Sequence, residues 1–146
     1  MNRRVGLCLA AAVAIVGLIA GYCPVLTASE RMSDKDVERM MTNLRNDAKR
    51  FQGSFNQSVG KSTIRKTQQE KDAKILVKNF VNQTNTMLTQ FKNSRQADAT
   101  LTNVRESAGR IDKLMTDVPL GPTTGDAWTR VKSELSTISD AFRARS

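Results

Sequence analysis

The residue types that carry most enzymatic chemistry are scarce in this chain. It contains no histidine, and its two cysteines, Cys8 and Cys23, both lie close to the N-terminus. Nucleophilic triads need a base that takes a proton from serine or cysteine, and that base is usually histidine. Zinc, haem and iron–sulfur sites depend largely on the same two residue types. We therefore predict no enzyme activity and no catalytic, cofactor-binding or metal-ligating residue.

Carboxylates are the strongest chemical groups that remain, and Asp34, Asp36 and Glu38 lie close together. A glycosidase needs two carboxylates across a cleft, and a small helical protein has little room for a cleft. Ser33 and Asp36 have the spacing of a capping box, the pattern of side chains that begins many helices. We therefore interpret these carboxylates as the first turn of a helix, where negative charge is favourable.

One short motif is similar to the end of a phosphate-binding loop. Gly60, Lys61 and Ser62 have the order of its last three residues. The full motif also needs a preceding strand and a glycine five positions earlier, where this chain has Phe55. The match is interpreted as chance.

The densest basic region of the chain runs from Lys61 to Lys78. Within it, Lys71, Lys74 and Lys78 share one face of a helix by their spacing. One interpretation is a docking face for a protein partner or an anionic membrane surface. The other is a solvated face with pairs one turn apart, such as Glu70 with Lys74. Nucleic acid is not favoured as a partner, because no aromatic residue is interleaved with these charges.

An uncharged segment follows, from Asn79 to Phe91. A helix surface without charge over that length is less usual in a chain with this many charged residues. The segment is either a face that a partner or a second copy covers, or drift in composition, and the sequence leaves both open.

Apolar residues after Ser33 recur at steps of three and four, which places them on one side of a helix. The four runs are Val37, Met41, Leu44, Ala48, Phe51, Phe55, Val59; Ala73, Val77, Phe80, Thr84, Met87, Phe91; Ala97, Leu101, Val104, Ala108, Ile111, Met115, Val118; and Trp128, Val131, Leu135, Ile138, Phe142. Short joints separate the runs, so neighbouring helices should be antiparallel. The sequence predicts an all-α, up-down antiparallel four-helix bundle after an N-terminal signal segment.

The first joint is the least defined. Gly60 is expected to end the first helix in a left-handed conformation, and Ser62 or Thr63 to cap the second. Ile64 is the only large apolar residue between Lys61 and Asp72. The second helix is expected from about Thr67, and the structure of residues 61–66 is left open.

Two further positions carry expectations about helix geometry. Residues 119–122 include two prolines, so no helix should continue through them. Thr123 and Asp126 then have the spacing to begin the last helix. Gly53 lies inside the first helix, where glycine is unfavourable, so it is expected to mark a close helix contact or a bend.

The N-terminus has the three-part layout of a secretory signal. Arg3 and Arg4 precede an uncharged, mostly apolar run over residues 5–22, and Ala28 is the best cleavage position. The run is also about long enough to span a bilayer, so an uncleaved inner-membrane anchor is the alternative. A lipoprotein would need a small residue before Cys23, where this chain has a tyrosine.

Two regions follow from this layout: a signal peptide over residues 1–28 and a helical bundle domain over residues 29–146. Removal of the signal takes away two arginines and no acid, which lowers the net charge from +9 to +7. The mature domain would be periplasmic or secreted and, having no cysteine, would depend on a packed core instead of disulfides. Its positive charge favours anionic partners.

The mature chain resembles an uncharacterised family of small, signal-bearing bacterial proteins of acidobacterial type. The resemblance is carried by Trp128-x-x-Val131-Lys132-x-Glu134-Leu135-x-x-Ile138-x-x-Ala141-Phe142, by Ala108-x-x-Ile111-Asp112-x-Leu114-Met115 and more loosely by Arg45-Asn46-Asp47-Ala48-x-x-Phe51. Where the family has a tyrosine near the end of its last helix, this chain has Phe142. The resemblance implies an exported helical protein and supplies no active site.

Together these features predict an exported, non-catalytic helical-bundle protein, most simply a protein-binding or adaptor module in the cell envelope. One alternative is a peripheral binder of anionic membrane surface that uses the basic segment 61–78. Another is a helical domain anchored in the inner membrane by residues 5–22. The candidate partner-binding residues are Lys71, Lys74 and Lys78.

Overall fold

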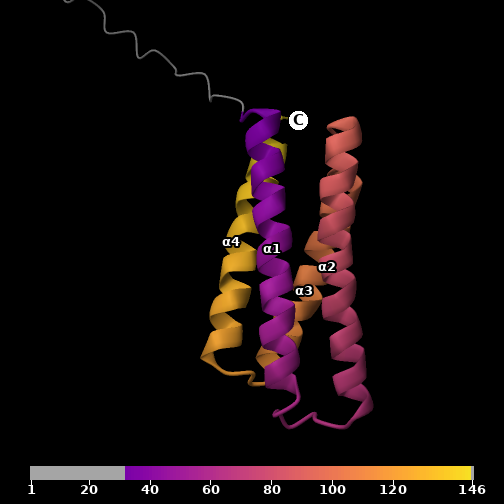
Figure 1. Cartoon of the computed structure of the whole chain (residues 1–146), viewed down its shortest axis with the longest axis vertical. Helices are drawn as coiled ribbons and strands as arrows, with labels where there is room; N and C mark the ends of the chain where they lie inside the picture. Colours follow the sequence, from indigo (N-terminus) through magenta and orange to yellow (C-terminus); the bar gives the residue numbers. More distant parts are fainter. Residues whose placement is uncertain (1–31, 146) are drawn as a thin grey trace, which may run out of the picture.

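The computed structural model describes residues 32–145, which form four α-helices (Figure 1). These are α1 (Asp34–Val59), α2 (Gln68–Ser94), α3 (Asp98–Asp117) and α4 (Pro122–Arg143). Successive helices run in opposite directions, and no strand occurs within the described range. The predicted all-α four-helix bundle is confirmed.

The predicted apolar runs form the core of the bundle. Every residue of the four runs is buried except Met115, which is half-buried. Full burial of one valine, leucine or phenylalanine side chain is worth roughly 1.5–3 kcal/mol, so these runs supply the main force that holds the helices together. The periodicity of the sequence therefore predicts which side of each helix faces inward.

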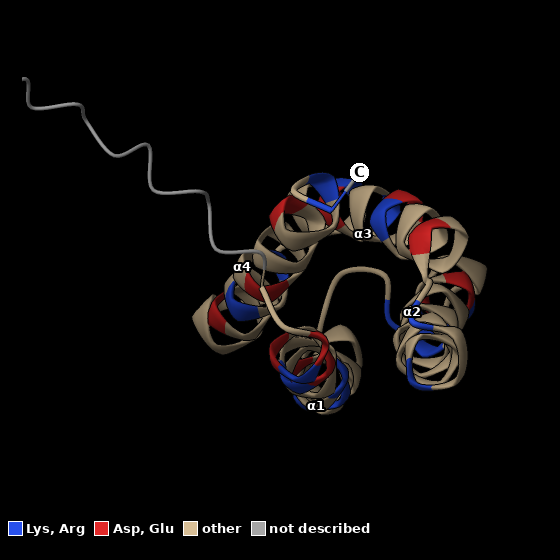
Figure 2. Ribbon diagram, turned by 90° about the horizontal axis from the view of Figure 1, so that it is seen from above, with Lys and Arg blue, Asp and Glu red and all other residues tan. Residues whose placement is uncertain are grey.

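The four helices are not packed equally. α1 lies between α4 and α2 and packs most closely against these two, whereas α3 packs mainly on α2 and touches α4 least (Figure 2). Trp128 of α4 bridges this sparse side, because its Nε1 donates a hydrogen bond to Asp112 Oδ1 of α3 at 2.8 Å. Its ring packs against Phe51 of α1 and Phe80 of α2, with centroids 4.8 Å and 5.5 Å apart. One buried side chain therefore joins all four helices.

The two ends of α1 agree with the sequence in position, and one of them differs in conformation. Ser33 Oγ accepts the backbone N–H of Asp36 at 3.2 Å and donates to its carboxylate at 2.6 Å, as expected for a capping pair. Gly60 ends the helix but keeps a right-handed φ of −66°, so the predicted left-handed conformation is wrong. The chain continues through further tight turns after Gly60, and a positive φ of 62° occurs instead at Lys66.

The N-cap of α2 is Thr67, not Ser62 or Thr63. Thr67 Oγ1 accepts the backbone N–H of Glu70 at 3.3 Å, and the Glu70 carboxylate accepts a backbone N–H from the loop before it. This resembles a capping box, except that the Glu70 carboxylate accepts the N–H of Lys66, the residue before the N-cap, and not that of Thr67 itself. Ile64 is buried in the core, so residues 61–66 fold back as turns and the helix begins only after them.

The last helix begins earlier than the Thr123 and Asp126 spacing predicts. α4 starts at Pro122, whose ring presets φ for a first helical position. Gly121 precedes it with a φ of 81°, a left-handed value that other residues rarely adopt. The proline therefore begins a helix here and does not merely interrupt one.

Gly53 does not mark a close helix contact. It is exposed, and a Cβ atom built at this position meets nothing within 4 Å. The predicted contact is therefore wrong, and α1 continues through Gly53 as one helix. The glycine is a local weakness on the outer surface of α1.

The predicted signal segment, with its cleavage position Ala28, lies outside the described residues. Among helices α1 to α4, none combines the length and the apolar character that a membrane crossing requires.

Candidate binding surface

The outward side of α2 carries the three lysines that the sequence singled out. Lys71, Lys74 and Lys78 are all exposed, opposite the buried residues of the helix. Lys74 Nζ pairs with Glu70 Oε1 at 2.6 Å, which confirms the expected pair one turn apart. Lys71 and Lys78 make no hydrogen bond or ion pair with any described residue. The face therefore contains one neutralised lysine and two available ones.

An exposed isoleucine lies among these lysines. Ile75 is 55% exposed, and within residues 32–145 the only other exposed large hydrophobic residue is Met32, at 37%. It lies four positions after Lys71 and three before Lys78, so it adjoins both on the helix surface. Its exposure was not among the predictions from the sequence, although its place outside the apolar run of α2 indicates it. We call Lys71, Ile75 and Lys78 the lysine–isoleucine patch.

Two acids, Glu70 and Asp72, offset part of the positive charge around this patch. The Lys74 ammonium, followed by the backbone N–H of Lys66, holds the pKa of the Glu70 carboxyl below its ordinary value. Glu70 is therefore fully ionised at neutral pH, and it is already engaged by the lysine one turn further along and by the loop. The nearby cations Lys61 and Arg65 are exposed at the same end of the bundle. The patch thus lies in a region with excess positive charge.

The uncharged segment forms the continuation of the same helix face. Asn82, Asn85 and Thr89 are exposed in line with Lys78. A shallow hollow of about 670 Å³ lies here, lined by Asn85, Thr86, Thr89, Gln90, Asn93 and Ser94. The outer surface of α2 is therefore cationic in its first part and made of amides and hydroxyls in its second.

The carboxylates near the start of α1 are engaged in ion pairs. Glu38 lies 3.3 Å from both Lys92 Nζ and Arg95 Nη1 of α2, and these two partners hold the pKa of Glu38 below its ordinary value. Asp34 pairs with Arg95 and with Arg145 near the C-terminus. These carboxylates form ion pairs between segments of the bundle. They do not face each other across a cleft, which is the arrangement that a glycosidase requires.

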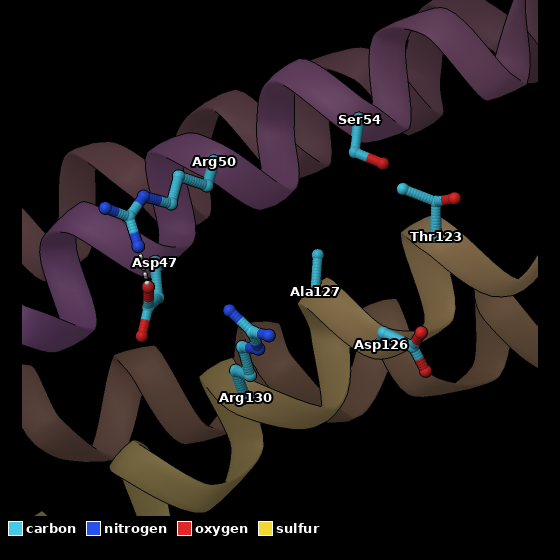
Figure 3. Close-up of a pocket in the computed structure, with 7 residues that line it drawn as sticks. All are labelled: Asp47, Arg50, Ser54, Thr123, Asp126, Ala127 and Arg130. Atoms are coloured by element: carbon cyan, nitrogen blue, oxygen red, sulfur yellow. Dashed lines mark hydrogen bonds and ion pairs between the residues drawn. The ribbon is translucent and has the colours of Figure 1, made fainter.

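A second hollow, of about 350 Å³, lies between α1 and α4 (Figure 3). Its lining residues are Asp47, Arg50, Ser54, Thr123, Asp126, Ala127 and Arg130. Arg50 is turned back onto Asp47 at 3.3 Å, and Ser54 Oγ is hydrogen-bonded at 2.9 Å to the buried hydroxyl of Thr124. Burial and the charge of Asp47 raise the pKa of the neighbouring Glu134. The hollow has the volume of a ligand site, but six of its seven lining residues are polar or charged, whereas ligand sites are lined mainly by hydrophobic and aromatic side chains.

Other chemistry has little support within residues 32–145. No group of three potential metal-ligating side chains comes together there. Lys61 and Ser62 lie in the turns after α1, with no strand before them, so the geometry of a phosphate-binding loop is absent from this part of the chain. The outer face of α2 is the most distinctive surface that the described residues present.

Comparisons with known proteins do not indicate a family or a function for this chain. No protein-family model matches the chain, and no curated protein or solved structure matches it either.

Proposed function

We propose that this protein is an exported, non-catalytic helical bundle that binds a protein partner in the cell envelope through the lysine–isoleucine patch of α2. One observation carries the proposal. Ile75 is 55% exposed, and the two lysines beside it, Lys71 and Lys78, have no ion-pair partner among the described residues.

The chemistry of this patch suits an acidic protein surface. An apolar side chain that becomes covered supplies affinity, while cations around it steer an acidic partner and fix its register. The histidine-free sequence and the absence of cysteine after Cys23 support binding over catalysis. The proposal holds whether residues 1–28 are removed or residues 5–22 are kept as an anchor, because either outcome leaves α2 outside the cytoplasm.

The test is crosslinking in living cells that export the full chain with a C-terminal tag. The binding variant carries Lys71→Glu and Lys78→Glu. A matched control carries Lys49→Glu and Lys113→Glu, which changes the net charge equally at two exposed lysines of α1 and α3 that have no ion pair. We expect the binding variant to lose at least about tenfold in partner capture, equivalent to about 1.4 kcal/mol, and the control to keep it. Equal capture by both variants would remove the patch from the account.

A second candidate is peripheral binding to an anionic membrane. It is favoured by one specific observation, that the basic loop residues Lys61, Arg65 and Lys66 are exposed next to the patch. Each basic residue near an anionic surface contributes about 1 kcal/mol, and salt weakens the attraction. Vesicles of phosphatidylglycerol and phosphatidylcholine test this candidate. Binding at low salt that Lys61→Glu and Lys66→Glu abolish would support it, and no binding at low salt would end it.

A further inference from the structure

The second part of the outer face of α2 offers hydrogen-bonding groups that the protein itself does not use. Asn82, Asn85, Thr89 and Asn93 are exposed, and their side chains make no hydrogen bond with any residue of the described range. The last three line the shallow hollow on this face. Each asparagine amide has donors and an acceptor on neighbouring atoms, the same pair of functions that a peptide group presents.

The spacing of these groups fits an extended chain. Asn85, Thr89 and Asn93 are separated by four residues each, so they recur about every 6 Å along the helix. In an extended peptide, backbone groups that face the same side recur every two residues, or about every 6.6 Å. The difference of about 0.6 Å per step is small enough for rotation of the asparagine side chains to absorb. The row can therefore hydrogen-bond successive backbone groups of one extended segment.

The lysine–isoleucine patch continues this row toward the N-terminus of α2. From Lys71 to Asn93 the outer face of α2 is about 33 Å long, a length that about ten extended residues cover. Cations without an ion pair occur only in the first part, since no residue from Asn79 to Phe91 is charged and Lys92 is paired with Glu38 of α1. A ligand that follows the face must therefore carry its negative charge at one end and be uncharged at the other.

Resting on the proposed function, we infer that the partner binds as an extended peptide segment with an acidic end. Lys71 and Lys78 hold the carboxylates of that end, and an apolar side chain of the segment covers Ile75. Asn82, Asn85, Thr89 and Asn93 bind the backbone of its uncharged part. Each lysine ammonium is a point charge on a flexible stem, so Lys71 and Lys78 can each pair with one carboxylate of that end.

The face fits other polyanions less well. A nucleic acid carries a phosphate at every nucleotide, whereas the only cation in the second part of the face, Lys92, is already paired with Glu38. A flat anionic membrane would likewise cover both parts, and the second part offers no unpaired cation to its headgroups. An extended segment with charge at one end matches both parts of the face at once.

The inference is tested with synthetic peptides of about twelve residues and the protein purified from cells that export the full chain. One probe carries glutamates and a leucine in its N-terminal half and serine, alanine and threonine in the other, and a second has the halves exchanged. Matched versions are N-methylated at alternate residues of the uncharged half, which removes backbone donors without changing charge. Affinity is measured by fluorescence anisotropy.

The protein variant carries Asn82→Ala, Asn85→Ala and Asn93→Ala. The control carries Asn43→Ala, Asn56→Ala and Asn103→Ala, three exposed asparagines of α1 and α3 that make no side-chain hydrogen bond with described residues. Alanine has the higher helix propensity, so both variants should keep their helices. We expect one of the two probes to bind the native protein, with both N-methylation and the α2 variant weakening it about tenfold or more, and the control unchanged.

Two results would overturn the inference. If neither probe binds, the outer face of α2 does not bind an extended peptide. If Lys71→Glu with Lys78→Glu weakens binding but N-methylation and the asparagine variant do not, only the charged end is recognised, and the proposed function stands without the extended segment. Failure of the proposed function is seen separately, as unchanged partner capture in the envelope when the patch lysines are reversed.

Discussion

The two ends of the bundle use charge in different ways. At the terminal end, where α1 begins and α2 and α4 finish, acids and bases from different helices are paired (Figure 1). Glu38 of α1 is 3.3 Å from both Lys92 and Arg95 of α2. At the loop end, around residues 60–67, the ion pair of the basic segment is local, between Glu70 and Lys74, and one pair between helices, Lys132 with Asp112, lies beside Trp128. Most ion pairs between helices therefore lie at the terminal end, whereas Lys71 and Lys78 remain available for a ligand at the loop end.

The two ends also differ in the side chains that pack there. Near the loop end, Trp128 lies 3% exposed against Phe51 and Phe80, and Ile64 closes the turns over the core. At the terminal end, the Arg95 and Arg145 guanidinium groups lie 5.7 Å and 5.6 Å from the Phe91 ring centroid, so cations also join the packing there. The core at the loop end is closed without Lys71 or Lys78, so these two lysines remain available for binding.

Removal of the tryptophan should cause the largest loss of stability. Trp128→Ala deletes a buried ring that contacts α1 and α2 and an indole N–H bonded to α3. We expect the free energy of unfolding to fall by about 3–5 kcal/mol, measured by urea denaturation. Trp128→Phe keeps most of the packing but not the hydrogen bond to Asp112, so its loss should be smaller. An equal loss in both variants would show that packing does not dominate at this end.

A stabilising change is expected on the outer surface of α1. Gly53→Ala replaces an exposed helical glycine where an added Cβ meets no atom within 4 Å, and should raise the free energy of unfolding by up to about 1 kcal/mol. Partner capture should not change, because the site is away from the outer face of α2. Gly121→Ala is the opposite control, since its φ of 81° disfavours a side chain and the variant should be less stable. Destabilisation by Gly53→Ala would reveal a contact that the structure lacks.

A smaller and pH-dependent effect is expected at the terminal end. Hydrogen bonds from Lys92 and then Arg95 lower the pKa of Glu38 from its ordinary value of 4.5. Its ionised form therefore stabilises the folded state above pH 4.5, and this contribution is lost as the pH falls through the lowered value. Glu38→Gln should reduce the urea midpoint slightly at pH 7 and leave it unchanged well below pH 4. The control is Glu106→Gln, an exposed glutamate without an ion pair, which should have no such pH dependence.

The fold was predictable because the spacing of apolar residues within each helix determines which side of that helix is buried. Steps of three and four place residues such as Val37 and Phe51 on one side of a helix whatever the helix packs against. The start of α2 was predicted at about Thr67, which is its N-cap, but the course of residues 61–66 before it was not predictable in the same way. It depends on Ile64 reaching the core, and that contact forms only once the helices are assembled. Thr67 and Glu70 had the spacing of a capping box, but Ser62 and Thr63 competed with them on equal local terms.

The candidate surface was predictable in part. The spacing of Lys71 and Lys78 places them on one face of the helix. The exposure of Ile75 could also have been predicted, because it lies outside the apolar run of its helix. Which lysines are paired depends on geometry between side chains. The pairing of Glu38 with Arg95 depends on how far α1 and α2 are shifted along each other, and no local pattern gives that shift.

One paired measurement tests the division between the two ends most directly. Partner capture and the urea midpoint are measured together for Glu38→Gln and for the double variant with Lys71→Glu and Lys78→Glu. We predict that Glu38→Gln lowers the midpoint and keeps capture, whereas the lysine variant loses capture about tenfold or more and keeps the midpoint. A lysine variant that captures the partner as well as the native protein does would contradict the account.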